Sequence, residues 1–130
     1  REEFQIPKLV GRVISENVAR NVMNPILMKV VTDGTGKSAN LLEYDVAGKT
    51  GTSQKTSGEG KRYSHDKYVG SFIAYAPADH PRIGVLVMIN EPQNGAYYGG
   101  TVAAPVVREI IRRSLLYLGV EPSKFQMAMQ

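Results

Sequence analysis

The chain has 130 residues, 42% of them hydrophobic, which predicts one domain with a buried core rather than a disordered segment. The formal charge of +4 comes from 16 basic and 12 acidic residues that are scattered along the chain, so no basic run predicts a nucleic-acid partner. The absence of cysteine excludes a disulfide framework and a thiol nucleophile.

The first predicted element is a helix over about 15–32. Ser15 can cap it, because a serine hydroxyl accepts one of the free first-turn N–H groups. Apolar residues then recur every four positions from Val18 to Val30, which predicts one broad buried face. Pro25 lies inside this stretch and lacks a backbone donor, so we expect a kink or two helices in tandem.

Three strands and a second helix follow. The stretch RIGVLVMIN is nearly all apolar in its middle, which predicts a strand covered on both faces. Short connections between consecutive strands favour antiparallel pairing, and helices before and after them would cover the sheet. The sequence therefore predicts an α+β fold, with strands at about 44–55, 67–76 and 82–90 and a C-terminal helix at about 101–118.

Two GK[ST] triplets raise the possibility of a phosphate-binding loop, one at Gly36 and one at Gly48. That loop needs a further glycine five residues upstream, because its backbone must curl around the phosphates. Val31 and Glu43 stand at those two positions, and neither can replace the glycine. A nucleotide-binding function therefore stays only as a weak alternative.

Shifted by one residue, the second triplet becomes Lys49-Thr50-Gly51-Thr52, a K-T-G element of the kind found in serine acyltransferases that react with β-lactams. On an edge strand, such a segment can pair with an extended peptide, and a glycine there leaves the approach open. Thr50 and Thr52 offer hydroxyls to a carboxylate, Lys49 supplies positive charge, and the Thr52 N–H can serve as an oxyanion donor.

The surrounding segments strengthen this interpretation. Six stretches of the chain closely resemble the class B penicillin-binding proteins, cell-division type. In chain order they are SENVARNV, TDGTGKSA, VAGKTGTSQK, KYVGSFIAYAPAD, RIGVLVMINEP and GAYYGGTVAAPV. The resemblance covers roughly residues 12–121. It implies that residues 1–130 are the C-terminal segment of a transpeptidase (penicillin-binding) domain, with part of a penicillin-binding-protein/serine β-lactamase-like fold.

The same resemblance implies a function and its site. The parent enzyme would be a peptidoglycan D,D-transpeptidase that cross-links stem peptides in septal cell-wall synthesis and binds β-lactams. Lys49 and Thr52 would be catalytic, Thr50, Gly51 and Thr52 would bind substrate, and no metal or organic cofactor is implied. The implied location is the periplasmic face of the cytoplasmic membrane, anchored by an N-terminal span absent from this chain. Implied partners are the rest of the domain and divisome proteins, including a glycan polymerase.

The family's nucleophilic S-x-x-K and its S-x-N motif are expected upstream of this chain. Ser64-His65-Asp66-Lys67 imitates S-x-x-K but follows the K-T-G element, and Ser15-Glu16-Asn17 imitates S-x-N at a helix start, so we reject both. His65 and His80 lack partners at metal-ligand spacing. One alternative of another class remains open, a non-catalytic interaction module with this fold, and an exposed sheet edge would favour association of the chain.

Overall fold

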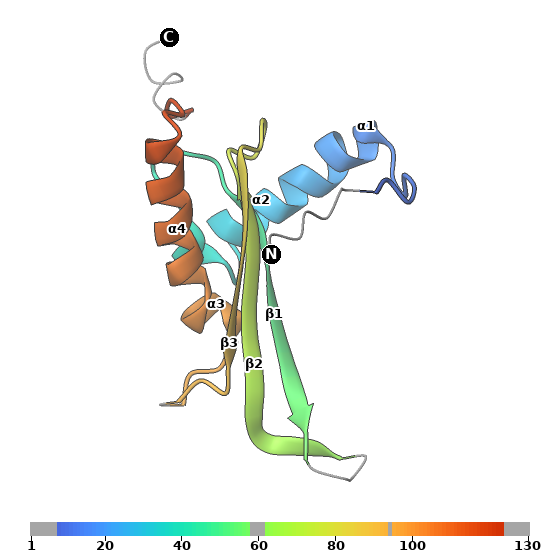
Figure 1. Cartoon of the computed structure of the whole chain (residues 1–130), viewed down its shortest axis with the longest axis vertical. Helices are drawn as coiled ribbons and strands as arrows, with labels where there is room; N and C mark the ends of the chain where they lie inside the picture. Colours follow the sequence, from blue (N-terminus) through green and yellow to red (C-terminus); the bar gives the residue numbers. More distant parts are fainter. Residues whose placement is uncertain (1–7, 58–61, 94, 124–130) are drawn as a thin grey trace, which may run out of the picture.

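The computed structural model describes residues 8–57, 62–93 and 95–123. The chain forms a three-stranded sheet with helical segments before and after it (Figure 1). In chain order the elements are α1 (Glu16–Val18), the π-helical η1 (Ala19–Met23), α2 (Asn24–Thr32), the 3₁₀-helical η2 (Lys37–Ala39), β1 (Ala47–Thr56), β2 (Tyr63–Ala76), β3 (Ile83–Asn90), α3 (Gly99–Val102) and α4 (Ala104–Tyr117).

The sheet has the order β1-β2-β3, and both pairings are antiparallel. Thr50 of β1 faces Phe72 of β2, which faces Val87 of β3, so these three residues share one face of the sheet. Helix α4 lies along this face, and α2 approaches β1 at the edge (Figure 1). The predicted α+β fold with three consecutive antiparallel strands is confirmed.

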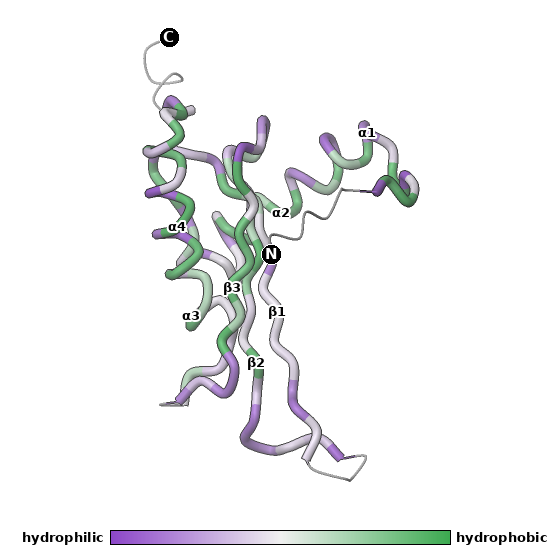
Figure 2. The backbone as a smooth tube through the Cα atoms, viewed as in Figure 1, coloured by the Kyte–Doolittle hydropathy of each residue, from purple (hydrophilic) through white to green (hydrophobic). Residues whose placement is uncertain are grey.

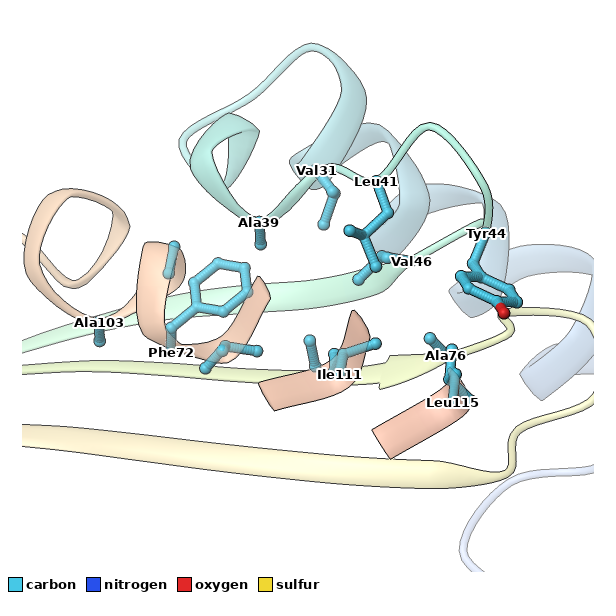
Figure 3. Close-up of a cluster of buried hydrophobic side chains, with 13 residues drawn as sticks. Val31, Ala39, Leu41, Tyr44, Val46, Phe72, Ala76, Ala103, Ile111 and Leu115 are labelled. Atoms are coloured by element: carbon cyan, nitrogen blue, oxygen red, sulfur yellow. The ribbon is translucent and has the colours of Figure 1, made fainter. Parts of the chain in front are cut away.

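The hydrophobic core lies between the sheet and α4 (Figure 3). Phe72, Ile111 and Leu115 are fully buried in it. The Phe72 ring leaves no room for a side chain at two neighbouring glycines, because an added Cβ at Gly36 or at Gly48 would lie 2.9 Å from ring carbons. The ring therefore sets how closely the 33–36 loop approaches β1.

The N-terminal helix accommodates Pro25 through a π-helical turn. The Asn24 N–H bonds to the Ala19 carbonyl, five residues back, and Pro25 lies in the first turn of α2, where its missing N–H costs least. The Ser15 hydroxyl accepts the Val18 N–H at 3.2 Å, as a cap does. The sequence prediction of a broad buried face was wrong for this chain: only Val31 is buried in α2, and the Ile26 side chain is 54% exposed.

The prediction that the third strand is covered on both faces was also wrong. Ile83, Val85, Val87 and Ile89 pack toward the core, whereas Leu86 and Met88 on the opposite face are 56% and 62% exposed. Figure 2 shows β3 green over much of its length, although β1 is paler. An apolar strand therefore forms one border of the sheet, and no described segment covers its second face.

Several element ends differ from those expected. β2 begins at Tyr63, upstream of the expected 67–76, because the S-H-D-K string continues the strand. The expected 44–55 strand begins at Ala47. The expected helix at 101–118 is divided at Ala103 into α3 and α4, with Pro105 in the first turn of α4.

Replacing Phe72 by alanine should destabilise the chain strongly, because it removes a fully buried ring against which the 33–36 loop and β1 pack. We expect Phe72→Ala to lower the free energy of unfolding by about 3–5 kcal/mol. The neighbouring Ile73 is 53% exposed on the opposite face, so Ile73→Ala should cost about 1 kcal/mol or less. Urea unfolding followed by circular dichroism compares the two, and equal losses would contradict this account of the core.

Candidate functional site

The K-T-G-T segment lies in the middle of β1, which is an edge strand within the described sheet. Because side chains alternate along a strand, Lys49 shares a face with Ile73, whereas Thr50 shares the opposite face with Phe72. The Lys49 side chain is exposed, and its ammonium donates a hydrogen bond to the Thr50 carbonyl at 3.0 Å. The predicted site residues are thus divided between the two faces of one strand.

Thr50 and Thr52 line a pocket of about 260 Å³, to which the loop at Thr35 and the segment at the start of α3 also contribute. The Thr35 hydroxyl lies 3.1 Å from the Thr50 hydroxyl, and the Gly99 N–H donates to the Thr52 hydroxyl at 3.4 Å. The remaining lining comes from Tyr98, Gly100 and Thr101 at the start of α3. The pocket therefore presents a set of neutral hydroxyls, which suits the binding of a small anionic group such as a carboxylate.

Sequence reasoning missed Thr35 and the two glycines of α3 as parts of this pocket. An added Cβ at Gly99 would lie 1.9 Å from the Ser71 carbonyl oxygen, and one at Gly100 would lie 2.0 Å from the Thr35 carbonyl oxygen. Only glycine allows α3 to approach the strands so closely. The consecutive glycines before the C-terminal helix were a visible signal, but they do not indicate which segment they contact.

Gly51 also has a structural reason that the sequence did not reveal. We expected a glycine there to leave the strand open to a substrate peptide. In addition, an added Cβ would lie 2.5 Å from the Ser71 hydroxyl, which donates to the Gly51 carbonyl at 3.3 Å. This contact favours glycine at the position, although rotation of the Ser71 side chain would relieve it.

Three tyrosine rings, those of Tyr68, Tyr97 and Tyr98, contact one another next to the pocket. The Tyr68 and Tyr97 rings stack with centroids 4.1 Å apart, and the Tyr97 and Tyr98 centroids are 4.4 Å apart. The hydrogen bond from the Tyr97 hydroxyl to the Tyr98 hydroxyl, together with the proximity of the two groups, raises the pKa of Tyr97. Tyr98 is 60% exposed and lines the hydroxyl pocket, whereas Tyr97 does not.

The S-H-D-K string is not a nucleophile–lysine pair in the structure. Ser64 is 7% exposed, and its hydroxyl donates to the Asp66 carboxylate at 2.6 Å. That hydrogen bond is the largest cause that lowers the pKa of Asp66. A serine that donates to a carboxylate two residues away, outside the hydroxyl pocket, makes a local contact within β2.

The other sequence candidates lie in local structure. Gly36-Lys37-Ser38 enters the short η2 segment, and Gly48-Lys49-Thr50 lies in β1, so neither triplet joins a strand to a helix as a phosphate loop does. His80 is exposed and contacts Asp79 with 3.1 Å between Nδ1 and Oδ2. Over residues 8–57, 62–93 and 95–123, no three His, Cys, Asp or Glu side chains gather as metal ligands would, and no helix is both long and apolar enough to cross a membrane.

Comparison with known proteins gives concordant results. The family model described as "Penicillin binding protein transpeptidase domain" matches residues 2–112. The chain is 44% identical over 94% of its length to stage V sporulation protein D of Bacillus subtilis, and 42% identical over 87% to the probable peptidoglycan D,D-transpeptidase PenA of Neisseria flavescens. It spans only 18% and 28% of the lengths of these relatives.

Solved structures resemble the chain in the same way. The transpeptidase domain of Burkholderia pseudomallei penicillin-binding protein 3 superposes with a TM-score of 0.76 at 40% identity, over 87% of this chain and 34% of that one. Penicillin-binding protein 3 of Mycobacterium tuberculosis, complexed with ampicillin, gives a TM-score of 0.69 at 32% identity, over 78% of this chain and 24% of that one. The sequence resemblance and the structural likeness therefore agree.

The assignment of Ser64 to a local hydrogen bond within β2 can be tested by titration. Because its hydroxyl lowers the pKa of Asp66, Ser64→Ala should raise that pKa toward the ordinary value of an aspartate. The stability that a depressed Asp66 pKa contributes is present above the ordinary pKa and is lost as the pH falls through the depressed value, so Ser64→Ala should lack this pH-dependent contribution. Carbon-13 NMR of the Asp66 carboxyl measures the shift, with Ser53→Ala on β1 as control; an unchanged midpoint in Ser64→Ala would contradict the assignment.

Proposed function

The chain belongs to the penicillin-binding protein transpeptidase family, and from this premise we propose that it is the C-terminal segment of a peptidoglycan D,D-transpeptidase domain. The observation that carries the proposal is the hydroxyl pocket, in which Thr50 and Thr52 of the K-T-G strand meet Thr35 and the start of α3. Since the chain spans less than a third of the curated relatives described above, the activity is that of the complete protein.

The proposed reaction is an acyl transfer through a serine that lies outside this chain. The serine oxygen attacks the carbonyl of a D-Ala-D-Ala bond, the terminal D-alanine leaves, and the acyl group then passes to an amine of a neighbouring stem peptide. No metal or organic cofactor has a step in this scheme. The residues of this chain contribute by binding the substrate and by stabilising charge.

Each K-T-G-T residue has a proposed role. The hydroxyls of Thr50 and Thr52 hold the carboxylate of the substrate or of a β-lactam, and the nearby Thr35 hydroxyl supports Thr50. The Thr52 N–H donates to the oxyanion of the tetrahedral intermediate, a contact worth about 3 kcal/mol in other acyl-transfer enzymes. Lys49, on the other face of the strand, supports the proton and hydrogen-bond network around the serine. Gly51 keeps the backbone accessible to the extended substrate.

The proposed setting is septal cell-wall synthesis at the periplasmic face of the cytoplasmic membrane. The relatives include peptidoglycan D,D-transpeptidase FtsI of Escherichia coli, at 37% identity over 85% of this chain and 18% of that protein. We propose β-lactams as ligands because the related Mycobacterium tuberculosis protein is complexed with ampicillin in its solved structure. The further proposed partners are the rest of the domain and divisome proteins, including a glycan polymerase.

Lys49 provides a direct test of the site in the complete protein. Lys49→Ala should lower the rate of acylation by fluorescent penicillin by about 10²- to 10⁴-fold, because proton transfer from the serine loses its support. The matched control is Lys37→Ala, which changes the exposed lysine of the other G-K-[ST] triplet and should leave acylation unchanged. Near-normal acylation of Lys49→Ala, with an intact circular dichroism spectrum, would remove Lys49 from the mechanism.

The chain without the upstream serine should form no covalent adduct. We expect no fluorescent band after incubation of residues 1–130 with labelled penicillin and denaturing electrophoresis, because Ser64 is engaged with Asp66. A labelled band that disappears in Ser64→Ala would show that Ser64 is a nucleophile after all. The complete protein serves as the positive control, and its failure to label would favour a non-catalytic interaction module.

A further inference from the structure

The hydrogen-bonded ladder between β1 and β2 is interrupted shortly after the K-T-G-T segment. Thr52 pairs with Gly70, Ser53 with Val69 and Gln54 with Tyr68, but the next pair joins Thr56 to Tyr63. One residue of β1, Lys55, thus stands opposite four residues of β2, at positions 64–67. Bulges of this kind redirect side chains and occur often beside active sites.

The side chain of Lys55 spans the width of the sheet at this interruption. Its ammonium forms an ion pair with the Glu91 carboxylate and lies 3.2 Å from the Asn90 side-chain oxygen, both at the end of β3. Lys55 therefore links the edge strand β1 to the far strand β3 across β2. The two charged side chains are 37% and 35% exposed, which is less than in the Arg20–Glu16 pair on the N-terminal helix.

The backbone of Glu91 is held in an unfavourable conformation that places its carboxylate there. Its φ angle is +50°, in the left-handed region that is uncommon for a residue with a side chain, and a proline follows it. Its N–H donates to the Tyr68 carbonyl at 2.8 Å, and its carbonyl accepts from the Gln93 side chain at 2.9 Å. Such conformations persist where several contacts hold them, and they occur often at functional sites.

We propose that Lys55 and Glu91 are positioning residues for the transpeptidase site: their ion pair holds the K-T-G strand in place where its ladder to β2 is broken. This inference rests on the proposed function. β1 has only one neighbouring strand in the described sheet, so its alignment depends on β2 and on side-chain contacts. Lys55 is three residues from Thr52, and loss of the pair loosens the strand that carries the hydroxyls and the oxyanion donor.

The test uses the complete transpeptidase and removes the charge of each partner. Lys55→Met and Glu91→Gln should each lower the second-order rate constant of penicillin acylation by about three- to fivefold, the range of a partly exposed ion pair. The charge-swapped variant Lys55→Glu with Glu91→Lys should recover most of the rate. Glu16→Gln is the matched control, because it removes another exposed ion pair that is far from β1 in the chain.

Amide hydrogen exchange provides a second measurement that does not depend on activity. In Lys55→Met and Glu91→Gln, exchange at Ser53, which pairs with Val69 of β2, should be faster by a similar factor, and it should be unchanged in Glu16→Gln. Variants with a lower melting temperature but wild-type acylation and wild-type exchange in β1 would overturn the inference. If the wild-type protein is not acylated at all, the proposed function fails, and the exchange data still decide whether the pair holds the strand.

Discussion

The packing of the Phe72 ring is the constraint on which the rest of the site depends. The ring occupies the space that side chains would need at Gly36 and Gly48, so a loop after α2 and the start of the K-T-G strand close onto the same side chain. That contact brings the Thr35 hydroxyl within 3.1 Å of the Thr50 hydroxyl. The hydroxyl pocket is thus assembled by the packing of the sheet's core.

Several apolar surfaces of the chain lie outside this core. Ile73, Leu86 and Met88 form an exposed group on the sheet face that carries Lys49, and Val22 and Ile26 are exposed on the N-terminal helix. Contiguous exposed apolar groups mark surfaces that bind other protein segments. The chain spans 34% of the solved Burkholderia transpeptidase domain, so we expect the rest of that domain to cover such surfaces.

Local patterns predicted the elements and the K-T-G strand, because helix periodicity, strand composition and a four-residue motif are contained in short stretches. The buried faces were predicted less well, since periodicity indicates that a face is apolar but not whether its cover lies in the same chain. Thr35, Gly100 and the Lys55–Glu91 pair were missed for a different reason. Each acts through a contact with a distant segment, and only the packing of Phe72 and the interrupted ladder of β2 bring those segments together.

The alternation of side chains along β1 places the hydroxyls and the ammonium of the K-T-G-T segment on opposite faces of the strand. Thr50 and Thr52 reach the pocket as neutral hydroxyl groups, whereas the Lys49 ammonium lies on the opposite face and donates to the Thr50 carbonyl. The carboxylate proposed to bind there would be held by hydrogen bonds rather than by direct contact with a cation. Lys49 lies on the face opposite the hydroxyls, where it is not placed to bind a carboxylate held by them. This separation supports the proposal that Lys49 acts on the serine and its protons.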